Sequence, residues 1–190
     1  MKIGDICDLN ADSYSTKDNW QQIKYLETGA ITNNIIEELK TIYPNTEKLP
    51  SRAQRKVQRG DIVYSMVRPN QRHYGIIKND IRNLLVSTGF TVISVNKQMA
   101  IPYYVYLYLT QDKIIDRLQS IAEQSTSAYP SIKPSDIEQI EVDFPSIEKQ
   151  EKIVAILSAL DDKIEVNRAV NKNLEATAQA IFKSWFVDFE

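Results

Sequence analysis

The sequence predicts a mixed α/β (α+β) domain followed by one long C-terminal α-helix that forms a coiled coil. Three patterns predict this fold: two short runs rich in β-branched residues, a stretch of apolar residues at helical spacing, and a C-terminal segment that lacks glycine and proline. We expect the domain to occupy residues 1–144 and the helix to occupy residues 145–190. A chain of 190 residues is long enough for one domain and one such helix, and too short for a large multi-domain enzyme.

Two runs in the first part of the chain have the composition of β-strands. Residues 61–67 (DIVYSMV) and 90–95 (FTVISV) are rich in valine, isoleucine and aromatic residues, and each follows directly after a glycine, Gly60 or Gly89. Branched and aromatic side chains are favoured in strands, and glycine commonly marks the turn before one. We expect a strand at each run.

Residues 101–121 have the spacing of a helix. Apolar side chains recur every three or four residues, and Pro102 occupies the first turn, where its missing N–H costs no hydrogen bond. We expect one helix whose apolar face is made by Tyr104, Leu107, Tyr108, Ile114, Ile115 and Leu118.

The segment from residue 125 to residue 144 is interpreted as the hinge that leaves the domain. It contains Pro130 and Pro134, and Pro145 follows just beyond it. Ser135 and Glu138 have the spacing of a helix-capping pair, which predicts a short helix before an extended exit.

The long helix carries an apolar seam with the alternating spacing of four and three residues that is typical of a coiled coil. The predicted dimer interface consists of Ile153, Leu157, Leu160, Ile164, Asn167, Asn171, Leu174, Ala178, Ile181 and Trp185. A helix of about 40 residues is about 60 Å long, so another helix has to cover this seam. Buried asparagines near the middle of a seam fix its register and orientation. A hairpin of two helices within one chain, broken near Asn167 and Asn171, stays open beside the preferred coiled coil between two chains.

Charge is distributed unevenly along the chain. The net charge is −2, yet residues 48–82 hold nine basic and two acidic residues, and residues 141–190 hold ten acidic and six basic residues. A basic middle and an acidic end can present separate faces to a polyphosphate and to a protein. The basic stretch is therefore the candidate contact region for nucleic acid.

Several classes of function lack the residues that they need. Cys7 and His73 are the only cysteine and the only histidine, which excludes an intrachain disulfide and an ordinary Cys/His zinc site. The five glycines are isolated, so no phosphate-binding loop can be built and we expect no bound cofactor. No apolar run is long enough to span a membrane and no leader pattern opens the chain, which predicts a cytoplasmic protein. We expect a binding and positioning module that is not an enzyme.

Several motifs resemble the DNA-specificity subunits of type I restriction-modification systems. In the first part these are residues 49–57 (LPSRAQRKV), 60–70 (GDIVYSMVRPN) and 73–75 (HYG), which are similar to a target-recognition domain. In the last part they are residues 145–150 (PSIEKQ), 152–157 (KIVAIL), 160–164 (LDDKI) and 182–189 (FKSWFVDF), which are similar to the spacer helix after such a domain. The usual subunit has two domains and two helices, so the chain resembles half of one.

The resemblance implies a division of labour between subunits. This chain would select a site on double-stranded DNA, while methyltransferase subunits would bind S-adenosylmethionine and methylate adenine N6. A restriction subunit would join them in systems that have one. Two copies would pair through the helix as a homodimer and read an interrupted, palindromic site, because the symmetry of a protein is copied into its half-sites. Trp185 and Phe186 would be able to dock the methyltransferases.

The residues expected to contact DNA lie in the basic stretch. Arginine and lysine would contact phosphates, whereas asparagine, glutamine and histidine would reach base edges. The candidates are Arg52, Arg55, Lys56, Arg59, Arg68, Asn70, Gln71, Arg72 and His73. Because several of these match the general pattern of the family, we expect part of the base reading in less patterned loops at residues 12–22 and 71–83.

Two other hypotheses stay open at this point. In the first, the chain is a structural adaptor that acts through its coiled coil and whose globular domain binds protein and not DNA. In the second, it is a fragment of a longer specificity subunit. DNA binding through several cations must weaken steeply with added salt, which separates the first alternative from DNA recognition.

Overall fold

The computed structural model describes residues 1–124 and 129–189, and the chain divides into two compact units. The first unit runs from Met1 to Gln150 and contains every strand that the structure describes. The second unit begins at Glu151 and continues the long helix. The predicted hinge begins at residues 125–128, which lie outside the described residues, as does residue 190.

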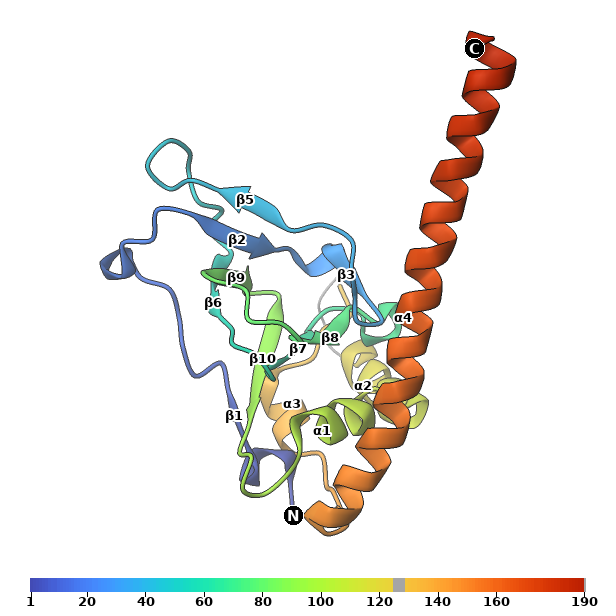
Figure 1. Ribbon diagram of the computed structural model, residues 1–190. Coiled ribbons are helices and arrows are strands. Elements are labelled where there is room, and N and C mark those ends of the chain that lie inside the picture. The colour runs from blue at the N-terminus through green and yellow to red at the C-terminus, as the bar shows by residue number, and fades with distance from the viewer. Residues whose placement is uncertain (125–128, 190) are drawn as a thin grey trace. The chain divides into compact units, whose positions relative to one another are not determined.

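The first unit contains an antiparallel sheet in the strand order β1-β10-β7-β8 (Figure 1). These strands are β1 (Cys7–Leu9), β10 (Phe90–Val95), β7 (Ile62–Ser65) and β8 (Tyr74–Ile76). In the register of the central pair, Val92 lies opposite Val63 and Ile93 lies opposite Ile62. Both strands predicted from composition are therefore present, and they are neighbours.

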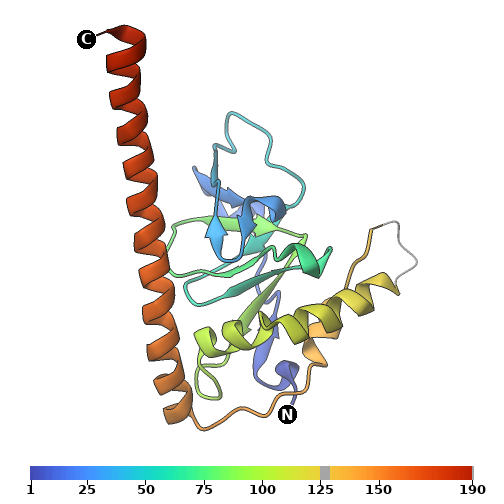
Figure 2. The same ribbon diagram turned by 90° about the vertical axis from the view of Figure 1, so that its right-hand side faces the viewer.

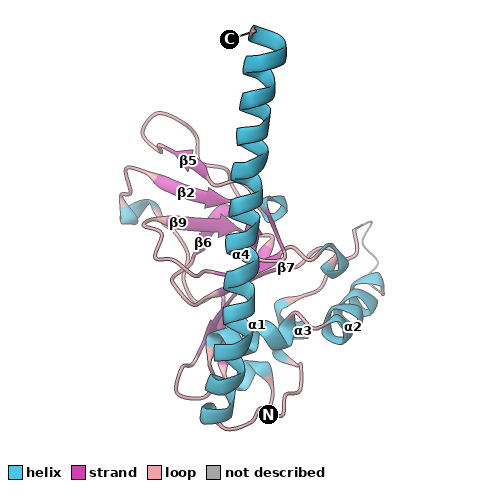
Figure 3. Ribbon diagram, turned by 45° about the vertical axis from the view of Figure 1, so that its right-hand side comes forward, coloured by secondary structure: helices cyan, strands magenta, loops and turns pink. Residues whose placement is uncertain are grey.

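A second sheet has the strand order β5-β2-β9-β6, and Figure 3 shows its strands side by side. They are β5 (Lys40–Ile42), β2 (Ile23–Leu26), β9 (Leu84–Ser87) and β6 (Ala53–Lys56). The pair β2 and β9 is parallel and the other two pairs are antiparallel. A short hairpin of β3 (Ile31–Thr32) and β4 (Ile35–Ile36) completes the strands, with Asn33 and Asn34 at positive φ in its turn.

The side chains of the first sheet alternate between two apolar clusters, because successive residues of a strand point to opposite faces. Ile62, Tyr64 and Ile93 pack with the helices of the first unit. Val63 and Val92 join an apolar cluster with residues of the second sheet. The members that the second sheet gives to this cluster are Leu26, Leu84 and Val86.

The stretch predicted as one helix at residues 101–121 forms two helices, α1 (Pro102–Leu109) and α2 (Asp112–Glu123), which follow each other along the edge of the first unit in Figure 2. The prediction of one helix was wrong because Gln111 is extended and caps α2, while the Thr110 hydroxyl donates back to the Tyr106 carbonyl. The predicted apolar face was also wrong in α1. Its buried residues are Val105, Tyr106 and Leu109, a face that spacing could not single out in a helix that is apolar all round.

The short helix predicted after Pro134 is present as α3 (Pro134–Glu138). Its cap differs from the predicted Ser135 and Glu138 pair. Lys133 precedes the helix in an extended conformation, and its backbone N–H donates to Asp136 Oδ2 at 2.6 Å. The cap therefore begins two residues earlier than the sequence pattern suggested.

A single long helix, α4 (Ile147–Lys183), begins within the first unit and makes up most of the second. It ends in a π-helical turn at Ser184–Asp188. At 1.5 Å per residue, α4 is about 55 Å long. The long C-terminal helix is confirmed, and in the described part of the chain no helix is both long and apolar enough to cross a membrane.

Candidate nucleic-acid interface

The nine predicted DNA contacts lie on two separate parts of the first unit. Four of them belong to β6 and the turns on either side of it, at residues 52–59. The other five belong to the loop between β7 and β8, at residues 68–73, which includes the short 3-10 helix Pro69–Gln71.

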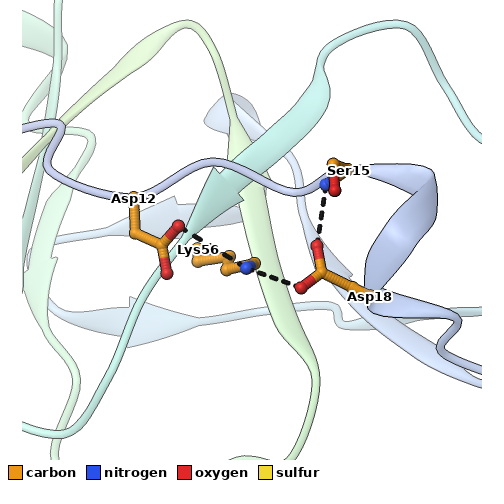
Figure 4. A network of polar contacts seen from close by, with 4 residues as sticks. All are labelled: Asp12, Ser15, Asp18 and Lys56. Atoms are coloured by element: carbon orange, nitrogen blue, oxygen red, sulfur yellow. Dashed lines mark hydrogen bonds and ion pairs between the residues drawn. The ribbon is translucent and has the colours of Figure 1, made fainter.

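Lys56, in the first group, has a side chain that is 21% exposed. Its Nζ lies 2.8 Å from Asp18 Oδ1 and 3.5 Å from Asp12 Oδ1 (Figure 4). The same Nζ lies 5.6 Å from the centre of the Trp20 ring. Asp18 also uses its second oxygen, which accepts from the Ser15 N–H at 2.8 Å. The hydrogen bonds from Lys56 and Ser15 lower the pKa of Asp18, and the hydrogen bond to Asp18 raises the pKa of Lys56.

The chain segment that carries Asp12 lies along β6. The Tyr14 N–H donates to the Gln54 carbonyl at 2.6 Å, and the Lys56 N–H donates to the Asp12 carbonyl at 3.3 Å. Ser13 and Arg55 form an antiparallel bridge between these bonds. Residues 12–14 therefore extend the second sheet by a short strand-like segment beside β6. At the Asp12 end of this segment, Lys56 contacts Asp12 through both its backbone N–H and its Nζ.

The three arginines of the first group differ in their surroundings. Arg55 is half-buried, and its Nε is buried with no hydrogen-bond partner in the described residues, so burial lowers the pKa of this guanidinium. Arg52 is exposed and lines a pocket whose other charged residues are Glu27, Glu37 and Glu38. Arg59 is exposed, and no ion pair ties it to another residue that the structure describes.

The second group lies against α2 and β3. Arg72 Nη2 donates to Asp112 Oδ1 at 2.7 Å, and this bond raises the pKa of the guanidinium still further. The Asn70 N–H donates to Gln119 Oε1 at 3.2 Å, and its side chain is exposed, as is that of Gln71. These contacts hold the loop along α2.

Arg68 and His73 stand at the two ends of this loop. The backbone of Arg68 has a φ of 48°, its N–H donates to the Pro130 carbonyl, and its guanidinium lies 5.5 Å from the centre of the Tyr129 ring. His73 Nδ1 lies 2.7 Å from the Ile31 carbonyl oxygen and 3.2 Å from Thr32 Oγ1. His73 therefore joins β8 to β3, and DNA contact by this ring stays a prediction.

A pocket of about 300 Å³ brings together the two loops in which base reading was expected. Asp12 and Trp20 line it from the loop before β2, and Asp80 and Arg82 line it from the loop before β9. Lys56 lies between the two loops in its wall. Arg82 is an exposed cation that was not among the predicted contacts, although it belongs to the predicted loop at residues 71–83.

No pattern in the sequence indicates the partners of Lys56. Asp18 is 38 residues away along the chain, and neither aspartate belongs to a recognisable motif. Within residues 1–124 and 129–189, no three His, Cys, Asp or Glu side chains are grouped so that they could hold a metal ion. The arrangement of exposed arginines, polar loops and one enclosed lysine has the chemistry of a binding surface.

All ten predicted seam residues are exposed. Nine of them belong to α4, and Trp185 belongs to the turn that follows it. Leu160, Ile164 and Leu174 are 57%, 47% and 62% exposed. Phe182 and Phe186 stack on each other at 5.1 Å near the end of the helix. Pairing through this seam stays a prediction.

Comparisons with known proteins point to one family. The model of the type I restriction modification DNA specificity domain matches residues 1–176. The type I restriction enzyme HindI specificity subunit of Haemophilus influenzae is 36% identical over 171 residues, which cover 90% of this chain and 37% of that protein. The MjaIX specificity subunit of Methanocaldococcus jannaschii is 36% identical over 107 residues, which cover 56% of this chain and 24% of that protein.

Solved structures show the same fold. The HsdS subunit from Thermoanaerobacter tengcongensis superposes with a TM-score of 0.73 at 22% identity, over 97% of this chain and 47% of that one. A chain from a structure described as the basis of complex assembly and conformational transition of the type I R-M system gives a TM-score of 0.73 at 23% identity, over 99% of this chain and 48% of that one. The chain spans less than half the length of each of these relatives.

Proposed function

Because the chain belongs to the family of type I restriction modification DNA specificity domains, we propose that it selects the DNA site of a type I restriction-modification complex. Specificity subunits of these systems recognise DNA and are not themselves catalytic. The observation that carries the proposal is the family match, which spans both the strand-rich unit and most of α4.

The chemistry of methylation belongs to partner subunits in this proposal. Methyltransferase subunits bind S-adenosylmethionine and methylate adenine N6, and a restriction subunit cleaves unmodified DNA in systems that have one. The adenine has to leave the base stack to be methylated, so the specificity subunit holds the enzyme at the site while this happens. The complex acts on DNA in the cytoplasm.

The exposed arginines of the first unit support DNA contact. Arg59 and Arg82 have no ion pair with the residues that the structure describes, so their charges are available to phosphates. Such contacts set position and affinity, and base edges are read by neighbouring polar side chains.

The exposed seam of α4 supports a homodimer. Two helices that pair along this seam would place two recognition units on one DNA duplex, which suits an interrupted palindrome. A helix of about 55 Å corresponds to about 16 base pairs, the largest separation that it could enforce.

Salt-dependent binding by the complex of this chain with its methyltransferase subunits tests the proposal. We expect tight binding to DNA of the recognised site, and a steep loss of affinity with added salt. Arg59→Ala should reduce the slope of log affinity against log salt by about one, the change expected for the loss of one phosphate contact. Lys133 is an exposed lysine just before α3, and Lys133→Ala should leave the slope unchanged.

The site itself is found by base-resolved methylation mapping in cells with and without the gene. Loss of adenine methylation at an interrupted palindrome is the expected result. Unchanged methylation together with salt-independent binding would overturn DNA recognition and favour a protein-binding adaptor.

A further inference from the structure

We propose that Lys56 is a positioning residue for DNA reading, which clamps residues 12–20 on β6 and does not itself bind phosphate. The clamp consists of Lys56, Asp12 and Asp18, and the segment that it holds is the base-reading element. This inference rests on the proposed function, because it assigns roles within the same DNA-binding surface.

The surroundings of Lys56 argue against phosphate binding. Two carboxylates lie within 3.5 Å and 2.8 Å of its Nζ, so the three charged groups together carry a net charge of −1. A phosphate that approached Nζ would have to displace an aspartate and would meet a second negative charge. The Trp20 ring lies 5.6 Å from the same Nζ and encloses it further.

Asp18 links the clamp to the local shape of the loop. One of its oxygens accepts from Lys56, and the other accepts from the Ser15 N–H, which fixes the 3-10 turn Thr16–Asp18 (Figure 4). The hydrogen bonds between residues 12–14 and β6 secure the segment on the other side of the turn. The turn is therefore tied to the sheet at its beginning by backbone bonds and at its end by Lys56.

The clamped turn presents polar side chains outward. Lys17 and Asn19 flank Asp18 and are both exposed, and Asn19 has a φ of 49° that turns the chain sharply toward Trp20. Lysine can donate to guanine O6 and N7, and asparagine pairs with adenine N6 and N7. We assign base reading to Lys17 and Asn19, with their position set by Lys56.

Two variants of the clamp separate this role from direct phosphate contact. Lys56→Met removes the ammonium and Asp18→Asn removes the carboxylate charge, each measured in the complex with the methyltransferase subunits. For both we expect discrimination between the recognised site and unrelated DNA to fall about tenfold, with the salt slope unchanged. Asp18→Asn is the sharper case, because removing a negative charge by itself would strengthen binding to any DNA.

The controls use residues outside the clamp. Arg59→Ala should lower the salt slope and leave discrimination nearly intact, and Lys133→Met should change neither quantity. Lys56→Arg keeps a cation beside both aspartates and should restore most of the discrimination. In the double variant of Lys56→Met with Asp18→Asn, the losses should not add, because the two residues act through one contact.

A reduced salt slope with unchanged discrimination in Lys56→Met would overturn the proposal and make Lys56 a phosphate ligand. Should Lys56→Met fail to fold, Asp18→Asn decides alone: tighter binding to all DNA with unchanged discrimination is the overturning result. A wild-type complex that does not distinguish any DNA site would instead refute the proposed function, so the two failures are distinguishable.

Discussion

Gly75, in the middle of β8, has no room for a side chain. A Cβ at this position would lie 2.5 Å from Ile31 Cδ1 and 2.7 Å from Asn34 Oδ1. That amide oxygen is already in use, since it accepts from the Ile76 N–H at 2.8 Å. Gly75 thus allows the β3–β4 hairpin to pack closely on β8, where His73 also joins it.

We expect Gly75→Ala to lower the free energy of unfolding by about 1–3 kcal/mol, because the hairpin must move to admit the methyl group. Gly29→Ala is the matched control, since a Cβ there meets nothing within 4 Å, and it should change stability by less than about 0.5 kcal/mol. Urea unfolding of both variants measures the difference. Equal midpoints would show that the hairpin is not packed on β8 in this way.

At the scale of single residues, the sequence predicted which basic residues belong to the candidate interface, but not which residues they contact. The basic residues of the candidate interface could be named because charge is visible in the sequence. Their partners could not, since Lys56 pairs with Asp18 and Arg72 pairs with Asp112 across long stretches of chain. From the sequence alone, a lysine in a basic stretch is expected to contact phosphate. The structure shows instead that the aspartates Asp12 and Asp18 pair with Lys56.

The elements of the fold were predictable where their composition is distinctive. The run at 90–95 coincides with β10, and the segment without glycine or proline forms α4. The break between α1 and α2 was not predictable, because Thr110 and Gln111 are ordinary helix residues. The parallel pair of β2 and β9 depends on contacts between distant segments, which no local pattern encodes.

Gln150 anchors the first turn of α4 within the first unit. Its side chain is 1% exposed, its Oε1 accepts from the Ile101 N–H at 2.9 Å, and its Nε2 donates to the Pro145 carbonyl at 2.9 Å. In the sequence, Gln150 belongs to the motif at residues 145–150 that resembles the start of a spacer helix, but the motif alone does not indicate what Gln150 does. One buried amide thus joins the start of α4 to the residue before α1.

We expect Gln150→Met to lower the free energy of unfolding by about 2 kcal/mol, because it leaves the partly buried Ile101 N–H and Pro145 carbonyl without their partners. Lys149→Met is the matched control on the same turn, where the side chain is exposed, and it should have little effect. Thermal unfolding of the whole chain provides the measurement. A stability loss equal to that of the control would contradict an anchoring role for the amide.

At the scale of the whole molecule, α4 leaves an apolar seam in contact with solvent. Ile153 and Leu157 are 38% and 37% exposed, and the exposed fraction of Leu160 reaches 57%. A long helix with large accessible side chains at a heptad spacing is typical of a coiled-coil partner. The two polar seam residues, Asn167 and Asn171, would set the register of such a pair.

Sedimentation of the chain over a range of concentrations tests this pairing, and we expect a dimer. Replacing both Leu160 and Ile164 with aspartate puts four like charges into the paired seam, so the variant should sediment as a monomer. The matched control replaces Ala169 and Ala176 with aspartate, which adds the same charge to exposed positions on the opposite face of the helix, and it should remain a dimer. A monomeric wild type, or equal dissociation of both variants, would mean that another helix covers the seam. The proposed palindromic site would need two copies of the chain. Under that proposal, the monomeric variant should also lose tight binding to the full site while retaining weak binding to one half of it.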